Sequence, residues 1–461
     1  MENLHMKEYC SQVQLTVNVL GFVMVPPSRP SPKTILYLSN LDDHLIVRRR
    51  FDTLLVYNNG SDNFFASQNP VKVIRDALSQ VLSYYYPLAG RVRRAEDGRK
   101  LEVECTGEGA LFVEASTHNT LSLLGELKEL KPSFEQLFFQ FPPTAEVEDQ
   151  PPLIFQVTRF DCGGFVVGVS FNHCLCDGRG AAQFLKGLAE TARGETKLSV
   201  EPVWQREFLK PQQHLDRVRF QHDEFLESGF IVNNNCSMQQ QMSNVKAEDL
   251  ILASFFISSD ALQSIKQPIA EEVKEHCTTF EVLAALVWRA RTRALGIPLH
   301  HAVRLLFAVD ARSAFDPPLA VGYYGNGQYL ACACSTTAQE VVNGSLSHAV
   351  KMIKKAKMSV NDEYLRSGIA FLEMKRSCQE MTDVRTCVED AYLTDWRWLG
   401  FNEVDFGFGE PLIASPISLL KTCGFPIAFL RPPKKKNGVK MVLCVPRPAF
   451  KALEMEMHSL M

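Results

Sequence analysis

Short apolar runs bounded by glycine or proline recur along the chain and predict β-strands. In the first half of the chain they cover residues 101–105, 111–114, 153–160 and 164–171, and in the second half they cover 303–309. The runs at 164–171 and 303–309 contain one polar residue each. Such continuous apolar runs are typical of strands that are buried on both faces.

Apolar residues spaced three or four positions apart predict helices between these strands. Pro70 opens the first helix, a position where proline is common. Thr278 and Glu281 fit a capping box at the start of another. The predicted helices cover residues 70–86, 180–192, 278–294, 345–357 and the segment from about 449.

Two polar stretches, 205–223 and 233–244, separate the two mixtures of strands and helices. Few packed contacts are expected in such stretches, so they predict a crossover between domains. The predicted architecture is α/β with mixed sheets. It comprises an N-terminal domain over 1–200, a crossover over 201–245 and a C-terminal domain over 246–461.

The composition narrows the class of protein. With 461 residues, 46% of them hydrophobic, the chain can bury a large core. Its formal net charge of -3 disfavours nucleic-acid binding, which normally needs a basic excess. The run at 13–25 is too short and too polar to span a bilayer, and residues 1–10 lack the pattern of a signal peptide. We therefore expect a cytoplasmic protein without membrane contact.

The 13 cysteines are scattered and odd in number, which favours reduced thiols over a disulfide framework. Cys174 and Cys176 form a CxC pair, as do Cys332 and Cys334. Structural zinc sites favour wider spacings, and residues two apart on a strand share one face. Both pairs therefore indicate core packing, and we predict no metal site.

His173 and Asp177 carry the most informative chemistry in the chain. They lie between the strand at 164–171 and the helix that begins near residue 180. A histidine at such a turn can be exposed at the edge of a rigid sheet, where its imidazole can take a proton from a hydroxyl or an amine. Asp177 is close enough to hold the turn through an ion pair or backbone hydrogen bonds. The HxxxD spacing alone is common, so its context carries the argument.

A second candidate segment, residues 403–411, alternates glycine with aromatic side chains. Gly407 and Gly409 predict a tight backbone turn above packed side chains. Asp405 has apolar neighbours and needs a cation or backbone donors as partners. We keep a structural and a proton-transferring role for Asp405 as hypotheses, and favour the structural one.

These motifs, in this order, resemble those of the BAHD acyl-CoA-dependent acyltransferases of plants. The resemblance rests on His173-x-x-x-Asp177-Gly178 and on Asp405-Phe406-Gly407-x-Gly409, and it covers essentially the whole chain. Phe408 departs from the tryptophan that is usual in the family. Family-like segments are 85–91, 309–312, 323–326 and 394–396, while 101–109 and 158–168 resemble the alcohol and taxane O-acyltransferases that use acetyl- or aromatic acyl-CoA.

The resemblance implies two similar α/β domains with mixed sheets flanked by helices, joined by a crossover loop as in chloramphenicol acetyltransferase. Acyl-CoA and the acceptor would enter a channel between the domains from opposite faces, with His173 at its centre. The implied enzyme is a monomer with no bound cofactor. It would move an acetyl group, or an aromatic acyl group such as benzoyl, from acyl-CoA directly to a hydroxyl of a plant specialised metabolite.

The resemblance also assigns roles to single residues. His173 would be the general base, Asp405 is a second catalytic candidate, and Asp177 would pair with Arg312. Four further roles are implied: oxyanion contacts by Thr394 and Trp396, space for the CoA arm at Gly178, loop geometry at Gly407 and Gly409, and CoA binding by Thr278, Thr279, Gly325 and Asn326.

Other functions stay open at this point. An N-acyltransferase acting on an amine or polyamine would use the same base. A non-catalytic relative that only binds ligands is disfavoured by the intact His173 motif. A condensation enzyme with carrier-protein donors shares that motif, but segments 323–326 and 405–409 match the CoA-dependent family. Covalent catalysis by Cys174 or Cys176 is disfavoured, because direct transfer in a ternary complex needs no thiol.

Overall fold

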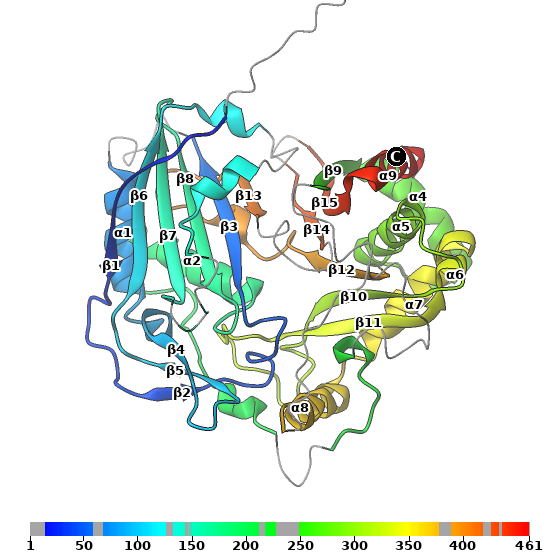
Figure 1. The fold of residues 1–461 in the computed structure, drawn as a ribbon, viewed down its shortest axis with the longest axis horizontal. Coiled ribbons are helices and arrows are strands. Elements are labelled where there is room, and N and C mark those ends of the chain that lie inside the picture. Colours follow the sequence, from blue (N-terminus) through cyan, green and yellow to red (C-terminus); the bar gives the residue numbers. More distant parts are fainter. Residues whose placement is uncertain are drawn as a thin grey trace, which may run out of the picture.

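The computed structural model describes residues 14–58, 68–125, 132–142, 146, 148, 150–211, 217–226, 249–377, 389–417, 426–432 and 436–460. Within them the chain forms two six-stranded sheets and a smaller three-stranded sheet (Figure 1). Much of the predicted crossover falls on 212–216 and 227–248, which lie outside the described residues. No helix in the described part is long and apolar enough to cross a membrane.

The first large sheet has the strand order β1-β6-β7-β8-β3-β13, and only its β6–β7 pair is parallel. Helices α1 (Pro70–Val81) and α2 (Gly178–Ala192) pack together and share an apolar core with this sheet. The strands are β1 (Asn18–Val25), β3 (Arg50–Tyr57), β6 (Ala110–Thr117), β7 (Leu153–Phe160), β8 (Phe165–Asn172) and β13 (Ile413–Pro416). The small sheet beside it comprises β2 (Ile35–Tyr37), β5 (Leu101–Glu104) and β4 (Arg91–Arg94).

The second large sheet has the order β11-β10-β12-β14-β15-β9, with parallel pairs β10–β12 and β12–β14. Helices pack on the outer side of this sheet (Figure 1). Trp288, in the helix over residues 279–294, is fully buried in the core that they share with the sheet. The strands are β9 (Leu250–Ser258), β10 (Ala302–Asp310), β11 (Gln328–Thr337), β12 (Asp390–Asp395), β14 (Ile427–Leu430) and β15 (Gly438–Pro446). The helices are α4 (Ser259–Val273), α5 (Thr279–Ala294), α6 (Ala338–Asn343), α7 (Leu346–Met358), α8 (Asp362–Ser377) and α9 (Arg447–Leu460).

The predicted fold class is confirmed, and most predicted elements are present within one or two residues of their expected bounds. The capping box of α5 is complete: the Glu281 backbone N–H donates to the Thr278 hydroxyl at 3.3 Å, and the Thr278 N–H donates to the Glu281 carboxylate at 2.8 Å. The helix predicted to end at residue 86 ends earlier, at Val81. Pro87 lacks an N–H for a helical hydrogen bond, and residues 86–89 form a short 3₁₀ turn instead.

The segment 401–416 belongs to the predicted C-terminal domain but packs on the first sheet. Its strand β13 pairs with β3, and the side chains of Phe401, Val404, Phe406 and Phe408 join the core between that sheet and α2. The chain therefore crosses between the two halves a second time. The domain bounds 1–200 and 246–461 stay a prediction, and the sheets do not follow them strictly.

Apolar side chains also join the two large sheets to one another. Leu54 on β3 and Val166 on β8 belong to the same buried cluster as Leu252 on β9, Ala428 on β14 and Val442 on β15. This cluster holds the second sheet against the first. Residues of the first sheet that face residues of the second sheet are therefore held in place by one continuous apolar core.

Candidate active site

His173 lies on a tight turn between β8 and α2. Its backbone N–H donates to the Arg49 carbonyl at 2.8 Å, and the Cys174 N–H donates to the Asn172 side-chain oxygen at 2.9 Å. The strand before the turn is buried over all eight residues, and α2 begins directly after Asp177. A rigid strand and a capped helix therefore hold the turn from both sides.

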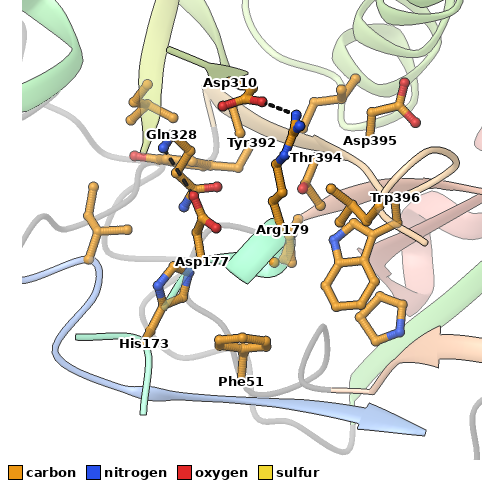
Figure 2. A pocket seen from close by; sticks show the side chains of 18 of the residues that line it. Phe51, His173, Asp177, Arg179, Asp310, Gln328, Tyr392, Thr394, Asp395 and Trp396 are labelled. Carbon is orange, nitrogen blue, oxygen red and sulfur yellow. Dashed lines mark hydrogen bonds and ion pairs between the residues drawn. The ribbon is translucent and has the colours of Figure 1, made fainter. Parts of the chain in front are cut away.

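The His173 side chain lines a cavity of about 370 Å³ between the two large sheets. Phe51 lies beside it, with the two rings edge-to-face at 4.9 Å between centroids. Thr394 and Trp396 lie across the cavity from His173, on the far side of the Arg179 side chain (Figure 2). The first sheet thus supplies the histidine, and the second supplies the opposite wall.

The electrostatic environment keeps the imidazole neutral. Burial lowers the pKa of His173 from 6.5 to about 4, and the nearby Arg49 guanidinium adds to the shift. A neutral imidazole has a free lone pair at physiological pH, which is the form that accepts a proton. The structure therefore holds His173 in the state that a general base requires.

The Asp177 carboxylate receives four hydrogen bonds, all from the protein itself. It accepts from the Gly180 N–H at 2.8 Å and from Arg312 at 2.9 Å, and from the N–H groups of Gly327 and Gln328 at 3.0 and 3.1 Å. Burial alone would raise the pKa of Asp177, but Arg312 and these donors hold it below its ordinary value. The predicted ion pair with Arg312 is present, and it joins the start of α2 to the second sheet.

Two glycines near this carboxylate allow close packing. A Cβ at Gly180 would lie 1.9 Å from the Tyr324 carbonyl oxygen, so no larger residue fits without moving the backbone. Gly178 lines the cavity, and a Cβ there would lie 3.0 Å from Leu399. Space for the CoA arm at Gly178 stays a prediction, whereas the need for glycine at position 180 was missed by the sequence analysis.

The Asp405 carboxylate is hydrogen-bonded to the backbone of its own loop. One of its oxygens accepts from the N–H groups of Gly407 and Gly409, both at 2.8 Å. Both glycines adopt positive φ, 100° and 87°, which side-chain-bearing residues rarely adopt. Asp405 is not among the residues that line the cavity with His173. The geometry supports the structural hypothesis for Asp405 and gives no support to the catalytic one.

Phe408, which stands where the family usually has tryptophan, is packed within this loop. Its ring lies edge-to-face against Phe165 at 5.1 Å, and Phe165 stacks on Tyr57 at 4.9 Å. The Tyr57 hydroxyl donates to the Val404 carbonyl at 2.8 Å. Phenylalanine therefore completes an aromatic cluster that fixes the loop on the first sheet.

Thr394 and Trp396, the predicted oxyanion contacts, both line the cavity. Thr394 lies near the end of β12, where it pairs with Ala428 of β14. The Trp396 ring stacks on Phe401 at 4.8 Å. Strand pairing fixes Thr394, and ring stacking fixes Trp396. The donor groups that they contribute are the hydroxyl of Thr394 and the indole N–H of Trp396.

The four predicted CoA-binding residues lie elsewhere. Thr278 caps α5, with Thr279 as the first residue of that helix. Gly325 is buried, and its carbonyl accepts a hydrogen bond from Arg312 at 2.8 Å. Asn326 is 1% exposed, and its side chain donates to Asp42 at 3.0 Å and to the His173 carbonyl at 2.7 Å. None of the four lines the cavity, so their contact with CoA stays a prediction, and the structure gives Asn326 a different set of partners.

The structure adds an ion pair that the sequence analysis did not identify. The Arg179 guanidinium, from the first turn of α2, contacts the Asp310 carboxylate at the end of β10. Figure 2 shows this pair across the upper part of the cavity. Nothing in the sequence indicates that residues 131 positions apart meet here.

Cys174 and Cys176 are fully buried, and burial raises the pKa of each thiol well above its ordinary value. Protonated thiols are poor nucleophiles. The described cysteines are all free thiols. In the described part of the chain, no cluster of three or more histidine, cysteine or acidic side chains is placed to hold a metal ion.

Comparisons with known proteins give the class of the chain. Residues 15–460 match the family described as "Transferase family". Taxadien-5-alpha-ol O-acetyltransferase of Taxus chinensis is 44% identical, over 98% of both chains. The 3'-N-debenzoyl-2'-deoxytaxol N-benzoyltransferase of Taxus canadensis is 46% identical, over 95% of both chains.

Solved structures show the same fold. Vinorine synthase superposes with a TM-score of 0.72 at 21% identity, over 96% of this chain and 98% of that one. TRI101 of F. sporotrichioides, in complex with coenzyme A and T-2, gives a TM-score of 0.66 at 17% identity, over 92% and 97%. The chain therefore belongs to the Transferase family, the BAHD acyltransferases, as its motifs predict. It is an enzyme of acyl transfer.

The structure predicts that Asp177→Ala and Asp405→Ala act through stability. Each change removes a carboxylate that accepts hydrogen bonds from buried or loop donors. Asp177→Ala also breaks the buried ion pair with Arg312, which keeps only the more exposed Asp310 as a charged partner, and breaking a buried pair costs up to about 3–5 kcal/mol. We expect melting temperature and soluble yield to fall together with turnover, more for Asp177 than for Asp405. A variant that keeps the parent's melting temperature and loses all turnover would instead give that aspartate a direct chemical role.

The depressed pKa of His173 predicts an unusual acid limb in the pH profile. A lowered pKa means that the neutral base persists below pH 6.5, so kcat/KM should decline only as the pH approaches about 4. Short assays over pH 4–8, with aliquots returned to neutral pH to detect unfolding, provide the measurement. A limb centred at the ordinary histidine value of 6.5 would contradict the environment described for this residue.

Proposed function

We propose that this protein transfers an acyl group from acyl-CoA to a hydroxyl of a specialised metabolite, with His173 as the general base. The observation that carries the proposal is the neutral imidazole of His173 in a cavity whose opposite wall bears Thr394 and Trp396. A proton acceptor and hydrogen-bond donors on facing walls suit attack of an alcohol on a thioester.

The proposed reaction has two steps, addition to the thioester and collapse of the tetrahedral intermediate. His173 takes the proton from the acceptor hydroxyl as its oxygen bonds to the thioester carbonyl carbon, which places the negative charge on the carbonyl oxygen. Donors on the wall formed by Thr394 and Trp396 stabilise this oxyanion. The intermediate then collapses: the carbon–sulfur bond breaks, CoA leaves as a thiolate, and the protonated imidazole returns its proton to the sulfur.

Coenzyme A as the carrier is supported by TRI101, which shares this fold and whose structure holds coenzyme A together with T-2. The names of the taxane relatives supply candidate acyl groups, acetyl and benzoyl. Aromatic and aliphatic side chains form much of the cavity surface, which suits apolar substrates. These residues include Phe51, Leu330, Tyr392, Leu393, Trp396 and Trp398.

The charges around the cavity favour a neutral hydroxyl over a cationic amine. Four arginines and three aspartates line it, and each aspartate is paired with an arginine: Asp177 with Arg312, Asp310 with Arg179 and Asp395 with Arg397. A polyamine would find no uncompensated carboxylate among these described residues. Transfer to a neutral amine is the second candidate, because an N-benzoyltransferase is 46% identical to this chain.

A screen of acyl-CoA donors against taxane, benzyl and aliphatic alcohols, with amines in parallel, tests the proposal by mass spectrometry of the products. We expect ester formation, and a loss of about 10²–10⁴-fold in turnover for His173→Ala at an unchanged melting temperature, the usual contribution of a positioned general base. Asn437→Ala, outside the cavity lining, is the matched control with parental turnover. A folded His173→Ala variant within a few-fold of the parent would contradict the assignment of the base, and amide products alone would shift the function to N-acylation.

Direct transfer predicts that no acyl-enzyme accumulates. Cys174 and Cys176 are the thiols nearest to His173 in sequence, and both are buried and protonated. Incubation with acyl-CoA alone should leave the intact mass of the protein unchanged, and initial rates should follow sequential kinetics. A stoichiometric adduct on either cysteine, discharged by the acceptor, would instead establish a covalent mechanism.

A further inference from the structure

Asp42, in the loop between β2 and β3, is completely buried and collects donors from three separate segments. One carboxylate oxygen accepts from the backbone N–H of Asn326 at 2.9 Å and from its side-chain amide at 3.0 Å. The other accepts from the Ser39 hydroxyl at 2.6 Å and lies 3.2 Å from the Arg206 guanidinium. Asp42 and Arg206 are both 0% exposed, so the ion pair is fully removed from water.

Both long-range partners of Asp42 also hold the catalytic turn. The side-chain amide of Asn326 donates to the carbonyl of His173 at 2.7 Å. The guanidinium of Arg206 donates to the carbonyl of Leu175, two residues further along the same turn. The carboxylate therefore orients two donors, and these donors bind the main chain on both sides of Cys174.

The Arg206 side chain has little freedom to move. Its guanidinium carbon lies 3.4 Å from the centre of the Trp204 ring and 5.2 Å from that of Tyr324. Tyr324 in turn packs edge-to-face on Trp204 at 5.9 Å. A guanidinium held between aromatic faces presents its N–H groups in a fixed direction, so the position of the Leu175 carbonyl is fixed as well.

A buried ion pair of this kind is a poor source of stability, because desolvation offsets most of the attraction between the charges. The contacts of Asp42 and its two long-range partners are, however, directed at one place, the main chain of the turn that carries His173. Asp177 holds the other end of the turn but does not contact the His173 carbonyl. The two carboxylates thus act on different parts of the turn.

We propose that Asp42, Asn326 and Arg206 form a positioning unit for the catalytic histidine, in which Asp42 orients two donors that fix the main chain of its turn, one at His173 and one at Leu175. The inference rests on the proposed function of His173. None of the three residues lines the cavity, so the unit acts through His173 and not on the substrates.

The variant Asn326→Ala tests the unit, because it removes both side-chain hydrogen bonds and keeps the backbone N–H that binds Asp42. We expect kcat to fall about 10–100-fold, since a displacement of about 1 Å can cost 10²-fold. KM for the acyl-CoA and for the acceptor should stay within about two-fold of the parental values. Ser367→Ala is the matched control: Ser367 is 1% exposed and hydrogen-bonded to His222 at 2.9 Å, away from the cavity lining.

A double-mutant cycle with His173→Ala separates positioning from general destabilisation. If Asn326 acts through the base, Asn326→Ala should cause no further loss in a chain that already lacks the imidazole. Asp42→Asn should reproduce the loss of kcat wherever it yields folded protein. An unchanged kcat in folded Asn326→Ala, or equal losses in the presence and absence of His173, would overturn the proposal.

A measurement that does not depend on enzymatic activity tests the positioning unit separately from the proposed function. The rate at which diethyl pyrocarbonate modifies His173, mapped by peptide mass spectrometry, reports the presentation of the imidazole. We expect this rate to change several-fold in Asn326→Ala and to match the parent in Ser367→Ala. A parent that transfers no acyl group from any donor would refute the proposed function, whereas identical modification rates in all three proteins would refute the positioning unit.

Discussion

The buried carboxylate of Asp177 is the interaction on which the site depends. It caps α2 through the Gly180 N–H and binds Arg312 and two backbone N–H groups at the start of β11. A buried charge with fewer partners would be costly, so the carboxylate requires both halves of the molecule to be in place. The turn that carries His173 is thereby tied to the second sheet, which supplies the opposite wall of the cavity.

The aspartates in and near the site are engaged by structural partners, which is consistent with the proposed role of His173 as the base. Asp405 binds the N–H groups of its own loop, Asp42 binds Asn326 and Arg206, and Asp310 pairs with Arg179. These carboxylates hold segments of the chain in place. The neutral imidazole of His173, with its lowered pKa, remains as the group suited to accept a proton from substrate.

The cavity exists because the chain crosses between the two sheets more than once. The segment 401–416 leaves the second half, packs its aromatic side chains on the first sheet and adds β13 to it. On the other side of that sheet, β3 and β8 share a buried cluster with β9, β14 and β15. Apolar burial thus fixes the position of one cavity wall relative to the other.

The amino-acid sequence was sufficient to predict most of the local structure and to single out His173 as the candidate base. Continuous apolar runs and helical spacing of apolar residues reflect burial and hydrogen bonding within short segments. The strand β7, the helices α2 and α5, and the capping box of α5 were therefore predictable. The motif around His173 and the resemblance it carries predicted the family. The distant partners of Asp42, Asn326 and Arg179, which lie 131 to 284 residues away in the sequence, became visible only in the folded protein. Such contacts depend on how two sheets pack, and no local pattern records that packing, so the hydrogen bond from Asn326 to the carbonyl of His173 could not be predicted from the sequence.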